Sequence, residues 1–166
     1  MLRRFSHLLL LGALVSFVSC GGSAATPTPL NVPFSTTDLI VGTGTTVAPG
    51  MGVEFSYVLY LYSTTAADNK GTEIADSNAT GPFVAVLGQN PPQMIAGLEQ
   101  GLIGMKVSGR RQIVVPPDLG YGASGQPAAG IPPNATLLFI VDLLQAQVVT
   151  AAKQPTQMRL PLPMPR

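Results

Sequence analysis

The chain is poor in the side chains that enzymes most often use for catalysis. Its 166 residues include one cysteine, one histidine and no tryptophan. Cys20 and His7 both lie within the first twenty residues, so processing of that segment would leave a domain with no histidine and no usable thiol. This excludes a Ser-His-Asp triad, a cysteine nucleophile, a zinc site built on histidine or cysteine, and any disulfide. Whatever chemistry remains depends on carboxylates, hydroxyls, backbone groups and shape.

Charge is also scarce. Only 10% of the residues are charged, against about a quarter in typical soluble domains. The formal net charge is +1 and no block of basic residues occurs, so we expect no nucleic-acid partner. Apolar residues make up 46%, and the 18 glycines and 16 prolines predict many turns. The length suits one domain with flanks.

The first twenty residues have the pattern of an export signal. Arg3 and Arg4 precede an apolar run over residues 8–18, which is too short to span a bilayer but suits a signal-peptide core. Ser19-Cys20-Gly21 resembles a bacterial lipobox, although Phe17 stands where that motif prefers leucine. We therefore expect a signal peptide over residues 1–19 and a lipid on Cys20. The alternative is an ordinary secretory signal with an incidental cysteine.

Composition divides the rest of the chain into three parts. Residues 20–36 are small, polar and rich in proline, and we expect a flexible tether after the lipidated cysteine. Residues 37–148 carry the periodic signal of a folded domain. Residues 149–166 contain four prolines and little periodicity, which predicts a disordered tail. The expected location is the cell envelope, on its periplasmic side. Gly21 after the cysteine favours the outer membrane of a diderm cell.

Period-two alternation predicts strands within the domain. From Val53 to Leu61 every second residue is large and apolar, whereas Glu54 and Ser56 face the other way. Three further segments alternate more weakly or are shorter, at residues 136–144, 38–41 and 111–115. These strands predict a sheet with one buried face.

One stretch has helical spacing. Asn90 is a suitable N-cap and Pro91 suits a first turn, and apolar residues then recur at Ile95, Leu98 and Leu102. Gly97 lowers the stability of such a helix by about 1 kcal/mol relative to alanine. A helix this short needs tertiary packing, so we predict an α+β domain whose antiparallel sheet curls over one helix.

Several motifs occur in one order along residues 71–137. They are Gly71-Thr72 with Asp76-Ser77, Leu87-Gly88, the segments 94–102 and 104–109, Pro117-Asp118-Leu119-Gly120-Tyr121-Gly122-Ala123 and residues 131–137 (IPPNATL). Together they closely resemble an FKBP-type peptidyl-prolyl cis-trans isomerase, over about 110 of the 166 residues. The resemblance implies a five- to six-stranded antiparallel sheet around one short helix, with an apolar pocket between them.

Carried over position by position, the resemblance implies a set of site residues. The catalytic candidates are Tyr57, Asp76 and Tyr121. The substrate-binding candidates are Phe83, Met94, Ile95, Leu98, Ile131 and Phe139. The backbone N–H of Ile95 and the Tyr121 hydroxyl would hold substrate carbonyls, and Asp76 would orient Tyr57. No cofactor or metal is expected. The expected partners are proline-containing polypeptides, and the protein is expected to be a monomer.

The implied reaction needs no catalytic base. Rotation about an X–Pro bond crosses a barrier of about 18–20 kcal/mol because it breaks amide resonance. The twisted amide has less charge separation than the planar one, so an apolar, dry pocket favours it. A domain without histidine or cysteine can therefore perform this reaction. The alternative is a weakly active or inactive module that binds proline-containing segments, or a chaperone.

Three positions depart from the family pattern. Leu98 stands where many members have a tryptophan at the pocket floor, and residues 90–92 lengthen the bend before the helix by about two residues. The acidic element allows two alignments. Asp76 takes the family's aspartate position if Ala75 replaces the phenylalanine before it; if Ile74 replaces that phenylalanine, Ala75 displaces the carboxylate. We favour the first, because it gives the apolar pocket one carboxylate at its rim.

Overall fold

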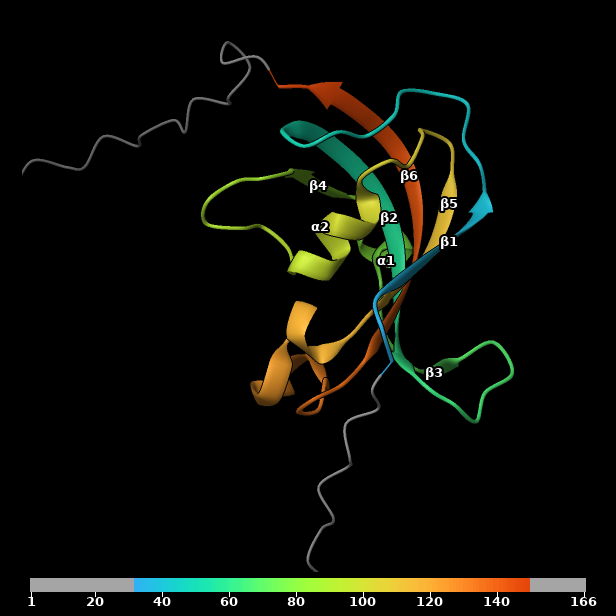
Figure 1. Ribbon diagram of the computed structural model, residues 1–166, viewed down its shortest axis with the longest axis vertical. Helices are drawn as coiled ribbons and strands as arrows, with labels where there is room; N and C mark the ends of the chain where they lie inside the picture. Colours follow the sequence, from blue (N-terminus) through green and yellow to red (C-terminus); the bar gives the residue numbers. More distant parts are fainter. Residues whose placement is uncertain (1–31, 150–166) are drawn as a thin grey trace, which may run out of the picture.

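A single antiparallel sheet curls around one short helix (Figure 1). The computed structural model describes residues 32–149. Its strands are β1 (Ser35–Ile40), β2 (Met51–Tyr62), β3 (Lys70–Asp76), β4 (Phe83–Val86), β5 (Arg110–Val115) and β6 (Leu137–Val148). The helices are α1 (Ser77–Thr80) and α2 (Ala96–Leu102), with 3-10 turns η1 (Pro117–Leu119), η2 (Gly122–Ser124) and η3 (Pro127–Ala129). The prediction of an α+β fold with a five- to six-stranded antiparallel sheet is confirmed.

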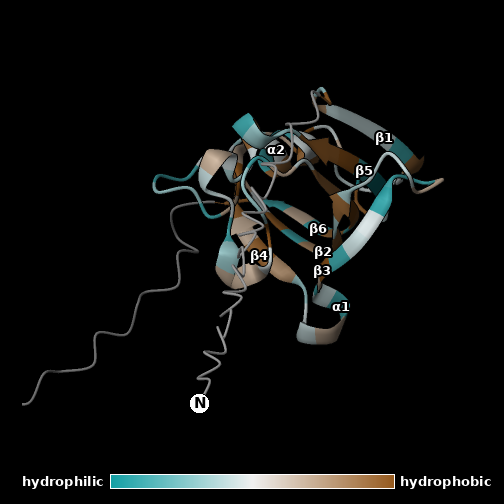
Figure 2. Cartoon of the chain, turned by 90° about the horizontal axis from the view of Figure 1, so that it is seen from below, coloured by the Kyte–Doolittle hydropathy of each residue, from teal (hydrophilic) through white to brown (hydrophobic). Residues whose placement is uncertain are grey.

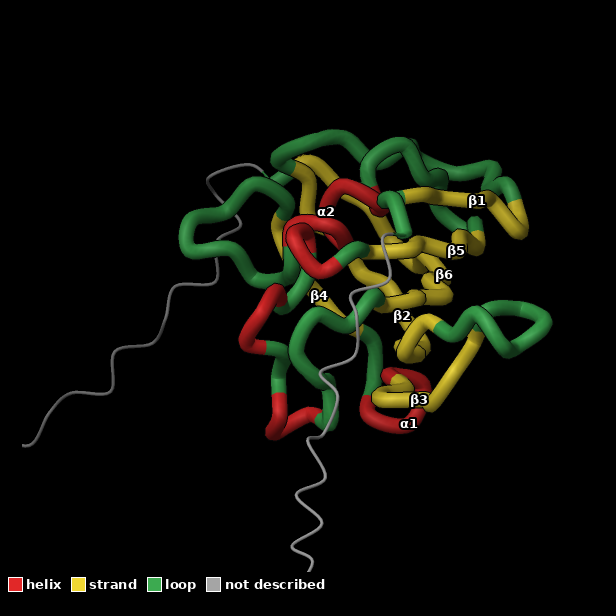
Figure 3. The backbone as a smooth tube through the Cα atoms, turned by 60° about the horizontal axis from the view of Figure 1, so that its bottom comes forward, coloured by secondary structure: helices red, strands yellow, loops and turns green. Residues whose placement is uncertain are grey.

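Strand order is β1-β5-β6-β2-β3, and β4 pairs with β2 beyond the end of β3. Figure 3 shows these strands side by side with α2 against one face. The longest pairing joins β2 to β6, from Met51 opposite Val148 to Leu61 opposite Leu137. Residues of β2 that point toward α2 therefore share that face with residues of β6.

The predicted strands all form, and two more appear. β3 and β4 lie along the same side of β2. From the sequence, β3 was covered only by a family motif, and β4 only by the site candidate Phe83. In β3 the sequence KGTEIAD does not alternate cleanly, because the register shifts where Leu59 faces Ala75 but Tyr60 faces Glu73. β4 has only four residues, too few for a period to be read.

The prediction of the helix start was wrong. α2 begins at Ala96 with Ile95 as its N-cap residue, so Asn90 and Pro91 lie in the preceding loop. Pro92 explains why Pro91 does not form the first turn, because a residue that precedes proline is pushed out of the α region. Helical spacing from Ile95 to Leu102 was nevertheless a correct sign of the helix itself.

The core lies between α2 and the concave face of the sheet. Phe55, Ile113, Leu137 and Leu143 are among its fully buried side chains. In Figure 2 the apolar residues gather on the strands where these face α2. The Tyr57 ring lies at the border of this core, half-buried.

Two glycines let α2 lie directly on β5. A Cβ at Gly101 would sit 2.5 Å from Cδ1, 2.6 Å from Cγ2 and 2.9 Å from Cγ1 of Ile113. One turn earlier, a Cβ at Gly97 would collide with the Val115 side chain. Glycine weakens a helix in isolation, yet at these positions it allows the close approach that buries α2.

A buried arginine ties the far end of α2 to the sheet edge. Arg111 Nε and Nη2 donate to the two carboxylate oxygens of Asp38 over 2.6 and 3.1 Å. Its Nη1 donates to the carbonyls of Gly101 and Ile103 over 2.9 and 3.1 Å. These carbonyls end the helix and have no intrahelical donor, so the guanidinium satisfies them and complements the helix dipole.

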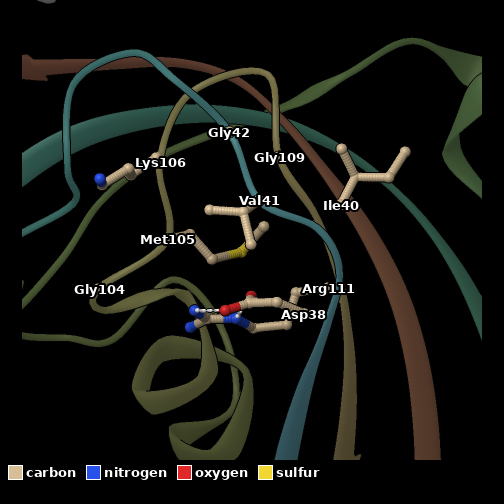
Figure 4. Close-up of a pocket in the computed structure, with 9 residues that line it drawn as sticks. All are labelled: Asp38, Ile40, Val41, Gly42, Gly104, Met105, Lys106, Gly109 and Arg111. Carbon is tan, nitrogen blue, oxygen red and sulfur yellow. Dashed lines mark hydrogen bonds and ion pairs between the residues drawn. The ribbon is translucent and has the colours of Figure 1, made fainter.

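The same pair forms the floor of a cavity of about 200 Å³ below Val41 and Met105 (Figure 4). Its two charged floor groups are already bonded to each other, and the guanidinium also bonds the helix carbonyls. We therefore attribute this cavity to the anchoring of α2. Within residues 32–149 no helix is long and apolar enough to cross a membrane.

The segment 1–31 and the tail 150–166 lie outside the described residues. The expectations placed on them concern the signal peptide, lipidation of Cys20 and the proline-rich tail. At the domain boundary the structure begins slightly earlier than expected, since β1 already starts at Ser35.

Candidate functional site

A cavity of about 110 Å³ opens between the start of α2, the concave face of the sheet and the loop that carries Tyr121. Strand β2 contributes two residues to it, β4 and β6 one each, and the loop before α2 three. The lining consists of Tyr57, Leu59, Phe83, Gln93, Met94, Ile95, Leu98, Tyr121 and Phe139. Seven of the nine expected site residues are therefore brought together, from parts of the chain up to 82 positions apart.

Aromatic rings form the inner wall. The ring centroid of Tyr57 lies 5.9 Å from that of Phe139 and 6.1 Å from that of the buried Phe55. Phe55 in turn lies 5.5 Å from Phe83. All of these pairs are tilted, which is a favourable arrangement for aromatic quadrupoles. Because each ring packs against another, the wall is fixed before any ligand enters.

Leu98 provides the aliphatic side of the cavity. It is 5% exposed and lies in the first turn of α2, beside Gly97, which packs on β5. The position of Leu98 therefore depends on how closely the helix approaches the sheet. A leucine in place of a larger aromatic leaves the cavity wider at this point.

Two hydrogen-bond donors reach the cavity without a partner in the described part of the chain. The backbone N–H of Ile95 precedes the first turn of α2 and makes no hydrogen bond to residues 32–149. The Tyr121 hydroxyl also has none among these residues. An apolar cavity with two free donors is suited to holding an amide with its carbonyls fixed.

Burial raises the pKa of Tyr121, and the nearby Tyr57 hydroxyl raises it further. The Tyr121 hydroxyl consequently keeps its proton at neutral pH and acts as a donor. Tyr121 is 37% exposed, in the Gly-rich loop between η1 and η2, so it stands at the mouth rather than in the core.

The structure does not bring Asp76 to the cavity. Its Oδ1 accepts hydrogen bonds from the backbone N–H and from Nδ2 of Asn78, each over 2.7 Å, which makes Asp76 the N-cap of α1. Asp76 was expected to orient Tyr57, but within residues 32–149 it makes no hydrogen bond to the Tyr57 hydroxyl. Instead, the Ser77 hydroxyl accepts a hydrogen bond from the Tyr57 backbone N–H over 2.7 Å.

Strand pairing explains where the carboxylate goes. Ala75 lies opposite Leu59, a lining residue, whereas Asp76 lies opposite Val58. Directly opposed residues of an antiparallel pair point to the same face, and successive residues alternate. Ala75 therefore points toward the core and cavity, and the Asp76 carboxylate points away. Ile74 also packs against the core. The geometry matches the second of the two alignments considered above.

Ile131 also lies outside the lining. It is 1% exposed, belongs to the core cluster and forms an isolated bridge with Gln126. There it fixes the end of the loop that carries Tyr121 and acts on the cavity only indirectly.

Two lining residues were missed from sequence. Leu59 could have been found, because it lies two residues after Tyr57 on the same face of a period-two strand. Gln93 had no such signal, since it lies in the loop before α2, where no period applies.

Comparison with known proteins gives this geometry a family. The model of the family "FKBP-type peptidyl-prolyl cis-trans isomerase" matches residues 44–144. The chain belongs to this family. That range contains every residue that lines the cavity, and it leaves β1 and both flanks outside.

Among curated FKBP-type relatives, the chain is 39% identical over 122 residues to a "Probable FK506-binding protein" of Corynebacterium glutamicum, covering 72% of this chain and 91% of that one. It is 38% identical over 109 residues to "FK506-binding protein 4" of Chaetomium thermophilum, covering 65% of this chain. It spans only 20% to 26% of the length of that relative and two similar long ones.

A solved FKBP-type structure has the same fold. FkpA from Escherichia coli superposes with a TM-score of 0.57 at 30% identity, over 70% of this chain and 49% of FkpA. The superposed part thus corresponds to about half of that protein.

Proposed function

We propose that this FKBP-type domain accelerates cis-trans rotation about X–Pro bonds in exported polypeptides, and that the cavity at the start of α2 holds the proline. The observation that carries the proposal is the pairing of an apolar, aromatic-walled cavity with two donors that have no partner within residues 32–149. Family membership supports the same reaction class.

The chemistry is non-covalent. The pyrrolidine ring packs on Tyr57, Phe83, Leu98 and Phe139, and the Ile95 N–H and the Tyr121 hydroxyl bind carbonyls on either side of the bond that rotates. Fixing both carbonyls while excluding water favours the twisted amide over the planar one. Each 1.36 kcal/mol removed from the barrier raises the rate tenfold.

Asp76 has a different role in this proposal. Its carboxylate caps α1 and thereby fixes the end of β3, while Ala75 takes the place next to the cavity. Tyr57 then contributes its ring rather than a carboxylate-oriented hydroxyl. Catalysis proceeds without a carboxylate at the rim.

A protease-coupled assay on short X–Pro peptides with the full-length chain tests the proposal. We expect turnover by the wild type and a clear loss in Tyr121→Phe, which removes one hydroxyl. Tyr62→Phe is the matched control, because Tyr62 is on β2 outside the cavity lining. Peptide binding without turnover would instead identify a binding module. If the wild type shows no binding and no turnover, the site is refuted.

The same proposal includes export and a lipid anchor at Cys20. Support comes from the paired arginines, the apolar run of residues 8–18 and the lipobox-like Ser19-Cys20-Gly21. Labelling with radioactive palmitate in a bacterial host should mark the wild type but not Cys20→Ser. An unlabelled but secreted wild type would point to an ordinary signal peptide. We further propose that the protein works as a monomer, which light scattering tests directly.

A further inference from the structure

The loop between β4 and α2, residues 87–95, forms one wall of the cavity and projects beside α2 in Figure 1. Two side chains fasten it. Glu99 Oε1 accepts a hydrogen bond from the Gly88 N–H over 2.6 Å, and Gln93 Oε1 accepts one from the Val86 N–H over 2.8 Å. The first holds the start of the loop to α2, and the second holds its end to β4.

The Val86 N–H is available to Gln93 because of the pleat of β4. The next residue, Leu87, donates its N–H to the Met51 carbonyl of β2 over 3.0 Å. Successive N–H groups of a strand point to opposite sides, so the Val86 N–H points away from β2. The Gln93 side chain therefore accepts a hydrogen bond from an N–H group that β2 does not pair.

This contact fixes the orientation of the Gln93 amide. A backbone N–H can only donate, so the oxygen of the amide faces Val86 and the amino group Nε2 faces the other way. Nε2 makes no hydrogen bond to any residue in the described range 32–149. Gln93 lines the cavity two positions before Ile95, whose N–H is also free.

We propose that Gln93 is a specificity-determining residue whose Nε2 donates a hydrogen bond to a main-chain carbonyl of the client, one carbonyl further along the chain than the one bound by Ile95. The inference rests on the proposed function, since the same cavity must hold the proline. Gln93 and Ile95 then form a short ladder of donors along one wall. That ladder selects clients that continue in extended form beyond the proline.

The two ends of the Gln93 amide can be tested separately. Gln93→Glu keeps an acceptor for the Val86 N–H but has no donor, whereas Gln93→Ala loses both. Gln100→Glu is the matched control, because it makes the same change at an exposed position of α2 outside the cavity lining. Each variant of the full-length chain is assayed on a long peptide that continues past the proline and on a short one that ends directly after it. Assays at high salt remove the effect of the added charge.

We expect a two- to tenfold rise in KM for both Gln93 variants on the long peptide, about the effect of one neutral hydrogen bond. For Gln93→Glu, which keeps the loop contact, we expect kcat to stay within twofold and no effect on the short peptide. Gln100→Glu should have no effect on either peptide. Wild-type behaviour of Gln93→Glu on the long peptide, with a loss only in Gln93→Ala, would overturn the donor role and leave loop anchoring. Equal losses of Gln93→Glu on both peptides would also overturn it.

Failure of the proposed function is a separate outcome. If the wild type shows no turnover, the dissociation constants of the same two peptides replace KM. A higher Kd of Gln93→Glu for the long peptide alone would still establish Gln93 Nε2 as a donor to the peptide. An unchanged Kd would refute that role.

Discussion

Replacement of Gly101 by alanine tests whether α2 lies on β5 only because a side chain is absent. The new Cβ would sit 2.5, 2.6 and 2.9 Å from three carbons of Ile113, where ordinary contacts begin at 3.4 Å. Ile113 is fully buried, so its side chain has little open space into which to move. To reach an ordinary distance, α2 must move outward by about 0.9 Å, the difference between 3.4 and 2.5 Å.

The expected magnitude follows from two opposing effects. Overpacking of a core costs about 1–3 kcal/mol, and three short contacts place this site in the upper half of that range. Alanine offsets up to about 1 kcal/mol through its better helix propensity, less here because Gly101 lies near the helix end. We therefore predict that Gly101→Ala lowers the free energy of unfolding by about 1–2 kcal/mol.

Urea unfolding measures this change, and Ile113→Ala supplies the decisive background. Removal of the Ile113 side chain takes away all three colliding carbons, so Gly101→Ala should become stabilising there. A coupling of about 1–3 kcal/mol between the two positions is expected. Gln100→Ala, at an exposed helix position, controls for helix propensity. A Gly101→Ala protein as stable as the wild type, or a destabilisation that persists in Ile113→Ala, would refute the close-packing argument.

The remaining predictions concern the site and the helix anchor. Tyr121→Phe should lower turnover equally at every pH around neutrality, because the raised pKa of Tyr121 keeps its hydroxyl protonated; a pH-rate profile that diverges from the wild type there would contradict this. Asp76→Ala should cost about 1 kcal/mol of stability through loss of the α1 cap and leave kcat/KM within twofold; a large kinetic loss in a folded variant would return the carboxylate to the site. The hydrogen bond from Arg111 lowers the pKa of Asp38 below its ordinary 3.8, so this pair stabilises the fold above that pH and the stabilisation disappears as the pH falls through the lowered value. Acid unfolding of Asp38→Asn should therefore be less steep than that of the wild type; identical curves would show that the pair is not linked to folding.

Strand content could be predicted wherever burial on one face leaves a period. The alternation from Val53 to Leu61 identified β2, because one side of that strand faces the core along most of its length. β3 could not be found this way. The register shift between Leu59 and Tyr60 leaves Ile74 without a directly opposed residue and interrupts the alternation.

Some residues of the site could likewise be predicted from the sequence, and others could not. The resemblance to the family, rather than the strand pattern, implied Tyr57, Phe139 and Tyr121 as site residues, and the structure has all three in the cavity lining. The choice between Ala75 and Asp76 could not be made from sequence, because one bulged residue decides which of the two shares the face of Leu59. The role of Gln93 could not be predicted from sequence either, since it depends on the hydrogen bond from the Val86 N–H, which forms only in the folded chain.

By itself the sequence determined the class of fold, and it limited the chemistry of the domain to shape, hydroxyls and backbone groups. Both follow from local rules: strand periodicity reflects one buried face, and a reaction cannot use imidazole or thiolate where neither occurs. Only the tertiary structure decided which side chains surround the cavity, because pairing register and the close approach of α2 at Gly97 and Gly101 are contacts between distant segments.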